Sequence, residues 1–147
     1  MHARYFVIKS NSELDLRRSL KHHIWASTDM GNKRLDKAFR ENRPHGPTYL
    51  FFSVNASGRF CGMAEMQSEV DLSRRSTVWA QDKWNGVFQV RWTFAKDIAN
   101  IYIRHILLAN NNNKPITNSR DTQEIPEGPG RQMLKIFLEA PSCSTLL

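Results

Sequence analysis

The strongest constraint on the fold is a pair of apolar runs that flank a short turn with glycine. Residues 49–54 and 60–66 are rich in apolar and aromatic side chains, and Asn55-Ala56-Ser57-Gly58 lies between them. Two such runs joined by a glycine-containing turn are typical of a β-hairpin. A third run, residues 87–94, alternates apolar and polar side chains as a half-buried strand does. We therefore expect a core built on a β-sheet.

Helical patterns lie on both sides of these strands. Ser12-Glu13-Leu14-Asp15 matches a capping box, which opens a first helix with one apolar face. A second helix is expected around residues 35–39, and a closing helix over residues 130–138. Residues 101–108 fit either a short helix or a strand. The chain is thus predicted to form one mixed α/β domain with no linker inside it.

The length of the chain allows a self-standing core. A chain of 147 residues is one ordinary domain and buries about two-thirds of the surface of its unfolded state. Cys61 and Cys143 have no neighbours at metal-ligand spacing, so we expect no metal, no cofactor and a reducing, intracellular environment. No apolar run approaches the roughly 20 residues that span a bilayer, and the N-terminus lacks the apolar core of a secretory signal. We therefore expect a soluble protein without a membrane partner.

The net charge is strongly positive. The sequence has 21 Lys and Arg against 14 Asp and Glu, a net charge of +7. Such a charge favours a polyanionic partner, because Lys and Arg that neutralise phosphates release condensed counterions. Many of these basic residues lie in the first third of the chain: Arg17, Arg18, Lys21, Lys33, Arg34, Lys37, Arg40 and Arg43. Each of them also fits a solvated helix face.

Two tryptophans lie in a polar segment that has no apolar periodicity. Trp79 and Trp84 belong to Val78-Trp79-Ala80-Gln81-Asp82-Lys83-Trp84-Asn85-Gly86. Side chains five residues apart diverge by about 140° on a helix and point to opposite faces of a strand. Only a loop can direct both indoles at one object. In a basic protein this arrangement indicates a pocket for a flat ligand beside a phosphate chain.

Short sequence blocks are spread over nearly the whole chain. In chain order they are Lys9-Ser10-Asn11, Ile24-Trp25-Ala26-Ser27-Thr28, Gly31-Asn32-Lys33-Arg34-Leu35, Phe52-Ser53-Val54-Asn55, Gly58-Arg59-Phe60-Cys61-Gly62, Val78-Trp79, Asp82-Lys83-Trp84 and Ser119-Arg120-Asp121-Thr122-Gln123-Glu124. In order and spacing these blocks resemble the YTH domain family.

The resemblance implies a fold and a function. The expected fold is a single α/β YTH domain over residues 4–139, with a curved, barrel-like central β-sheet wrapped by α-helices; residues 140–147 are expected to form a mobile tail. The implied function is that of a non-catalytic reader of N6-methyladenosine in single-stranded RNA, acting in the control of mRNA fate. Protein effectors would be recruited by regions outside the domain. We expect a cytoplasmic location and leave a nuclear one open.

The resemblance also implies an aromatic cage for the methylated base. Trp25, Trp79 and Trp84 match its three walls, and all three are tryptophan here. A branch of the family has an aliphatic residue at the last wall, so Trp84 places the chain nearer the all-tryptophan readers. Trp25 alone also fits a core indole at the end of the first helix.

Further residues are assigned to the RNA by the same resemblance. The backbone carbonyl of Ala26 is expected to accept the remaining N6 hydrogen, and Asn11 and Asp15 are expected at the base edge. The candidates for the flanking phosphates are Lys9, Arg34 and Arg120. Alternatively, Asp15 only closes the capping box with Ser12, and Arg120 forms a structural ion pair with Asp121 or Glu124.

Two other classes of function are weighed against this one. In an RNA-directed enzyme, Glu65 would be a buried catalytic carboxylate and Cys61 a nucleophile, but Glu65 also fits an ion pair at a strand edge. The five histidines show no paired spacing for a metal. A cage for methylated lysine also uses tryptophans, but Lys33 and Lys83 would repel that cation.

Overall fold

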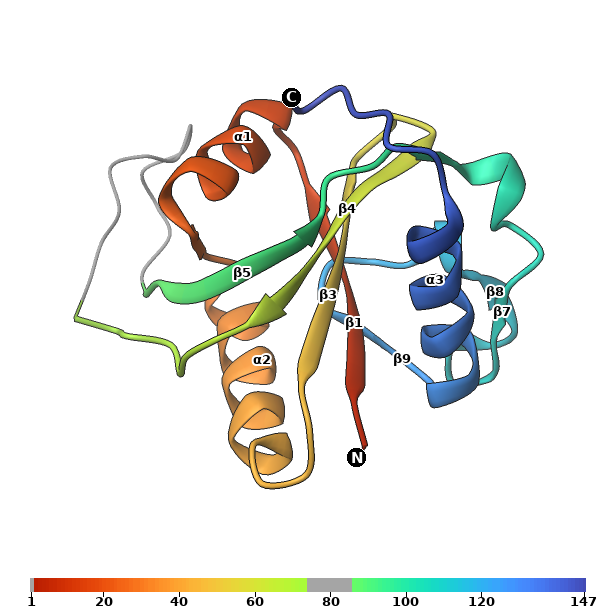
Figure 1. Ribbon diagram of the computed structural model, residues 1–147. Coiled ribbons are helices and arrows are strands. Elements are labelled where there is room, and N and C mark those ends of the chain that lie inside the picture. The colour runs from red at the N-terminus through yellow and green to blue at the C-terminus, as the bar shows by residue number, and fades with distance from the viewer. Residues whose placement is uncertain (1, 74–85) are drawn as a thin grey trace.

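The computed structural model describes residues 2–73 and 86–147, and Trp79 and Trp84 lie outside this part of the chain (Figure 1). The described part contains three α-helices, a large mixed sheet and a small two-stranded sheet. The helices are α1 (Glu13–His22), α2 (Asp29–Asn42) and α3 (Glu127–Glu139). The strands are β1 (Arg4–Ser10), β2 (Ile24–Trp25), β3 (Thr48–Val54), β4 (Arg59–Met66), β5 (Phe88–Phe94), β6 (Ile98–Ala99), β7 (Leu107–Leu108), β8 (Lys114–Pro115) and β9 (Gln123–Ile125).

The large sheet has the order β2-β5-β4-β3-β1-β9, with β6 paired to β4. β1 and β3 pair in parallel, and the other pairs are antiparallel. Figure 1 shows the strong twist that carries β5 across the direction of β1. The described strands form an open path from β2 to β9, so the barrel-like sheet expected from the resemblance does not close here.

The predicted hairpin is confirmed. β3 and β4 pair antiparallel, and Gly58 in their turn has a φ of 73°. A φ in this left-handed region favours glycine, because a Cβ would be strained there. The strand predicted over residues 87–94 is also confirmed as β5, and burial alternates along it from Phe88 to Arg91.

Residues 101–108 form neither the single helix nor the strand that the sequence allowed. A short 3-10 helix, Asn100–Tyr102, is followed by a turn and by the two-residue strand β7. β7 pairs only with β8 among the described strands. The alternatives failed because Arg104 and His105 are exposed and interrupt the apolar run.

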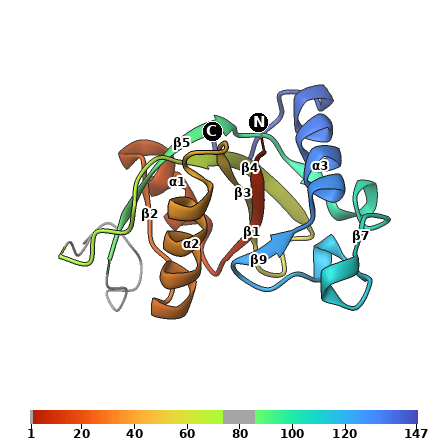
Figure 2. The same cartoon turned by 90° about the horizontal axis from the view of Figure 1, so that it is seen from below.

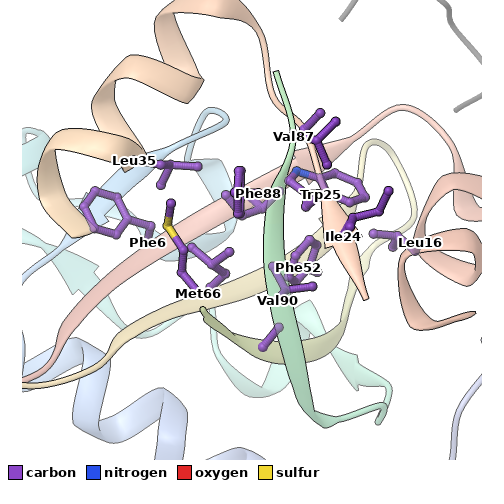
Figure 3. Packing of buried hydrophobic residues seen from close by; sticks show 14 of the residues in the cluster. Phe6, Leu16, Ile24, Trp25, Leu35, Phe52, Met66, Val87, Phe88 and Val90 are labelled. Atoms are coloured by element: carbon purple, nitrogen blue, oxygen red, sulfur yellow. The ribbon is translucent and has the colours of Figure 1, made fainter. Parts of the chain in front are cut away.

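The sheet separates two apolar cores. Successive residues of β1 point to opposite faces, so Phe6 belongs to one core and Val7 to the other. Figure 2 shows α1 and α2 on one side of the sheet and α3 on the other. The first core contains Leu16 of α1 and Leu35 of α2 (Figure 3). The second contains Phe137 of α3. Trp92 of β5 packs on the first core, and its indole N–H donates to Ser19 Oγ (3.0 Å).

The C-terminal residues lie on the domain, although the sequence alone predicts a mobile tail there. Leu146 is 6% exposed and joins the first core. The Thr145 N–H donates to Asp97 Oδ2 (3.0 Å), and Arg17 donates to the Thr145 carbonyl (2.9 Å). These contacts hold the last residues against α1 and the loop before β6.

Candidate functional site

A cavity of about 400 Å³ opens where β1, β2 and the loop before β9 end side by side. Its walls contain six of the residues singled out from the sequence, which are Lys9, Asn11, Asp15, Trp25, Ala26 and Arg120. The remaining wall residues are Ser10, Ser12, Ser27, Thr28, Asn55, Ser119 and Asp121. The cavity is therefore built from four separate stretches of the sequence, residues 9–15, 25–28, 55 and 119–121.

The first wall is the turn from β1 into α1. Ser12 caps the helix, and its Oγ accepts the backbone N–H of Asp15 at 3.2 Å. This half of the predicted capping box is confirmed, and it places Asp15 in the first turn at the cavity. The carboxylate of Asp15 is also 3.9 Å from Arg18 Nη1. Asn11 lies beside it, and its Oδ1 accepts an N–H of Asn55 at 2.6 Å.

Trp25 belongs both to the cavity and to the core. It is 5% exposed, and its ring meets the Phe52 ring edge-on, with centroids 5.0 Å apart and an interplanar angle of 85°. Figure 3 shows it among the side chains of the first core, close to Ile24 and Val87. The structural alternative for this indole therefore holds, and it coexists with a place in the cavity wall.

The segment after β2 is held by buried polar groups. The N–H of Ser27 donates to Asn32 Oδ1 (2.8 Å), and its hydroxyl donates to Asp121 Oδ2 (2.7 Å). The other oxygen of Asp121 accepts the backbone N–H of Lys9 at 3.0 Å. Burial raises the pKa of Asp121. Asp121 thus joins three of the stretches that line the cavity, those of Lys9, Ser27 and Asp121 itself.

Sequence reasoning missed Asn32 as a site residue and considered Asp121 only as an ion-pair partner. Both are single polar residues with no periodic pattern around them. Both lie within the blocks Gly31-Asn32-Lys33-Arg34-Leu35 and Ser119-Arg120-Asp121-Thr122-Gln123-Glu124, and this was the only signal available from the sequence.

The basic residues differ in how they are placed. Lys9 points its ammonium group into the sheet, where Nζ donates to Ser53 Oγ at 2.9 Å, and burial lowers its pKa. Arg120 is exposed at the cavity, and within the described residues it makes no ion pair. The expected alternative partner Glu124 is instead bound by Arg4, with two contacts of 2.8 Å.

Arg34 does not reach this cavity. It lies on the outer side of α2, and its Nη1 donates to Thr122 Oγ1 at 2.6 Å. There it lines a separate hollow of about 480 Å³ together with Arg4 and Lys37. The structure therefore separates Arg34 from Lys9 and Arg120.

The chain on both sides of residues 74–85 is fixed near the same helix. Asp71 and Val87 pair with each other through hydrogen bonds of 2.8 and 3.2 Å. Asn32 Nδ2 lies 3.5 Å from the carbonyl of Gly86, and Asp36 Oδ1 accepts the N–H of Val70 at 2.8 Å. Residues 70–71 and 86–87 therefore lie close to each other and to α2.

The two residues considered for catalysis, Glu65 and Cys61, have structural surroundings: one is in an ion pair and the other is buried. Glu65 forms the expected strand-edge ion pair, 3.2 Å from Arg91. Cys61 is buried, and burial raises the pKa of its thiol to about 12, so it is a protonated thiol at neutral pH. Over residues 2–73 and 86–147, no group of three or more His, Cys, Asp or Glu is placed to hold a metal ion. In the same ranges no helix is both long and apolar enough to cross a membrane.

The sequence of this chain matches part of several longer proteins. "YTH domain-containing family protein 2" of Danio rerio is 60% identical over 136 residues, which cover 92% of this chain and 22% of that protein. "YTH domain-containing family protein 3" of Homo sapiens is 58% identical over 134 residues, covering 91% of this chain and 23% of that protein. The chain thus spans about a quarter of the length of these relatives.

Solved structures with the same fold include RNA complexes. The YTH domain of Zygosaccharomyces rouxii MRB1, in complex with N6-methyladenosine RNA, matches with a TM-score of 0.91 and 42% identity over 99% of this chain and 92% of that chain. The Toxoplasma CPSF4 YTH domain, in complex with a 7 mer m6A-modified RNA, matches with a TM-score of 0.89 and 28% identity over 99% of this chain and 96% of that chain. The family model of the YT521-B-like domain, YTH, matches residues 3–138. The chain therefore belongs to the YTH domain family.

Proposed function

We propose that this domain binds single-stranded RNA that carries N6-methyladenosine and that it holds the modified base in the cavity beside Trp25. The observation that carries the proposal is the convergence of Asn11, Asp15, Trp25 and Ala26 on one hollow of about 400 Å³. This volume is in the usual range for small-molecule sites, about 300–1,000 Å³. The two solved relatives that bind methyladenosine RNA have the same fold, which supports the proposal.

The methyl group is enclosed by three indoles, those of Trp25, Trp79 and Trp84. Methylated adenine is neutral, so the attraction comes from stacking, dispersion and the removal of the methyl group from water. Burial of one methyl group is worth about 0.8 kcal/mol. Unmethylated adenine would bury a second N–H against indole faces, at a penalty of roughly 1–3 kcal/mol. The two effects together give a preference of tens-fold to hundreds-fold, most of it from the unpaired donor.

The polar groups of the cavity read the edge of the base. The carbonyl of Ala26 accepts the one hydrogen that remains on N6. Asn11 uses its oxygen to accept an N–H of Asn55, so its NH2 group is the part that donates to the base. Adenine N1 and an ionised Asp15 are both acceptors, and a water molecule or a proton on the carboxyl must lie between them.

Basic residues add affinity without selecting the base. Arg120 is the main candidate for a flanking phosphate, because it is exposed at the cavity. Lys9 contributes positive potential from beneath the cavity, since its ammonium group is bound to Ser53. Arg34 contacts the RNA backbone from the neighbouring hollow.

The RNA must be unpaired at the modified base. A stacked and paired adenine cannot offer both faces and its Watson–Crick edge to a pocket. The domain acts as a binding module without catalysis, in the cytoplasm, and parts of a longer protein would recruit the effectors that decide the fate of the bound mRNA.

A cage for methylated lysine is disfavoured by charge. Such cages gain from nearby carboxylates that attract the cation. Here the positive charges of Lys9 and Arg120, which line the cavity, offset the negative charges of Asp15 and Asp121. A trimethyl-lysine peptide should therefore compete for the site far less well than free N6-methyladenosine.

The decisive experiment is titration calorimetry with two RNA oligonucleotides that differ only by the methyl group. We expect the methylated strand to bind tens-fold to hundreds-fold more tightly, as derived above. Equal affinities would refute the proposal. The same labelled strand, incubated with excess protein, should be recovered without cleavage or demethylation, and any such product would revive an enzymatic function.

A further inference from the structure

The peptide bond between Ala26 and Ser27 forms part of the cavity wall and lies outside regular secondary structure. β2 ends at Trp25, which is paired with Phe88, and α2 begins after its cap at Thr28. Neither a sheet ladder nor a helix therefore fixes the orientation of this peptide group. Some other contact must do so if the Ala26 carbonyl is to receive a ligand.

That contact comes from the side chain of Asn32. Asn32 lies in the first turns of α2 and is 2% exposed. Its Oδ1 accepts the N–H of Ser27 at 2.8 Å, and its Nδ2 faces the carbonyl of Gly86 at 3.5 Å. The close approach depends on Gly31, because a Cβ at that position would overlap Ser27 Oγ.

The geometry of the peptide unit turns this bond into a direction for the carbonyl. The Ala26 carbonyl and the Ser27 N–H belong to one planar group, and in a trans peptide they point in opposite directions. No cis peptide bond occurs in the described part of the chain. Because the Ser27 N–H points at Asn32 on α2, the Ala26 carbonyl points away from α2. The same bond polarises the peptide and makes its oxygen a stronger acceptor.

We infer that Asn32 is a positioning residue that aims the Ala26 carbonyl into the cavity, and that through this carbonyl it selects bases with a hydrogen on the N6 substituent. The inference rests on the proposed function, in which this carbonyl accepts the N6 hydrogen. Asn32 itself touches no RNA. The hydroxyl of Ser27 is held separately by Asp121, so loss of the Asn32 side chain frees the peptide to rotate without releasing the segment.

A suitable probe is RNA with 6-methoxypurine in place of N6-methyladenosine. This base keeps the ring and the methyl group, but an oxygen without hydrogen replaces the N–H. When 6-methoxypurine faces the fixed Ala26 carbonyl, that buried acceptor has no hydrogen to accept. We therefore expect the wild-type domain to bind this RNA roughly tenfold more weakly than the N6-methyladenosine strand.

Three variants distinguish a role of Asn32 in orienting the Ala26 carbonyl from a general role in stability. Asn32→Ala removes the acceptor, and the preference for N6-methyladenosine over 6-methoxypurine should fall to roughly threefold or less. Asn32→Asp keeps an oxygen for the Ser27 N–H and should restore the wild-type preference. Asn42→Ala is the matched control, since this buried amide on the same helix donates to Gly46 and Pro47 instead. It should lower stability and leave the preference unchanged.

The outcomes distinguish the two proposals. If the wild-type domain does not prefer N6-methyladenosine over adenine, the proposed function fails. If it does, but binds 6-methoxypurine equally well, the Ala26 carbonyl does not accept the N6 hydrogen and the role of Asn32 is overturned with it. If the wild type discriminates and Asn32→Ala keeps the preference, only the role of Asn32 is overturned. Should Asn32→Ala not fold, hydrogen exchange of the wild-type Ser27 amide gives the answer, because exchange at the rate of an unprotected amide would refute the aiming bond.

Discussion

The hydroxyl of Ser27 and the carboxylate of Asp121 lie 2.7 Å apart although 94 residues separate them in the chain. This bond ties the segment after β2 to the loop before β9, and the second oxygen of Asp121 ties that loop to β1 at Lys9. A single half-buried carboxylate therefore holds these parts of the cavity together.

The first prediction concerns pH. Burial raises the pKa of Asp121 in the folded state, so the native protein binds more protons than the unfolded chain at pH values above the unfolded pKa of about 3.9. The contribution of Asp121 to stability is therefore fully present below that value and is lost as the pH rises through the folded pKa. Denaturant titrations at several pH values give the free energy of unfolding. Between the unfolded and the folded pKa of Asp121, we expect this free energy to fall with rising pH in the wild type relative to Asp121→Asn. Parallel curves would show that Asp121 titrates at its ordinary pKa.

The second prediction separates the proposed cage residues. Trp79→Ala or Trp84→Ala should abolish the preference for methylated RNA while the domain stays folded. Trp25→Ala should also destabilise the domain, by about 3–5 kcal/mol, because this indole packs against Phe52 in the core. Calorimetry and chemical denaturation measure the two effects. A methyl preference that survives in both Trp79→Ala and Trp84→Ala would contradict the cage assignment.

The third prediction addresses Asp15. Asn in its place can donate to adenine N1, so Asp15→Asn should preserve or tighten the binding of methylated RNA. The cap of α1 should be unaffected, because Ser12 accepts the backbone N–H of residue 15 rather than its side chain. A tenfold loss of affinity with unchanged circular dichroism would mean that the carboxylate itself is required.

The fourth prediction concerns the phosphates. Arg120→Ala should weaken methylated and unmethylated RNA alike and reduce the slope of log K against log salt by about 0.7, the value for one contact with a single strand. Arg131→Ala is the control, since this exposed arginine pairs with Glu127 on α3, on the other side of the sheet. Loss of methyl preference alone in Arg120→Ala would show that this side chain reads the base.

The fifth prediction tests the C-terminal residues. Leu146→Ala should destabilise the domain by roughly 2–3 kcal/mol, because its side chain is buried in the first core. Leu147→Ala provides the comparison, since Leu147 is 89% exposed and should change stability little. If the two variants melt alike, the end of the chain is the mobile tail that the sequence suggests.

The sequence predicts the elements that have a long enough pattern. The hairpin of β3 and β4, the alternation along β5 and the cap at Ser12 all follow from local rules. A two-residue strand such as β2 or β7 has no period to detect, and its pairing is decided by distant residues. The parallel pairing of β1 with β3 is likewise a long-range event.

The candidate site shows the same division. The resemblance brought forward Trp25 and Ala26, and the cavity contains both. It grouped Arg34 with Lys9 as phosphate ligands, but α2 carries Arg34 to another hollow and the sheet turns the ammonium group of Lys9 inward. Such directions depend on tertiary packing, which a motif does not encode. Trp79 and Trp84 lie outside the described residues and stay a prediction.

The position of β1 between β3 and β9 has a consequence for synthesis on the ribosome. β1 is the first strand of the domain to be made, but Tyr5 pairs with Ile125, and Arg4 is held by Glu124. The sheet therefore stays incomplete until nearly the whole domain has left the exit tunnel. A nascent domain that lacks β9 also lacks Arg120 and Asp121, so the cavity has all of its wall residues only after translation has passed this point.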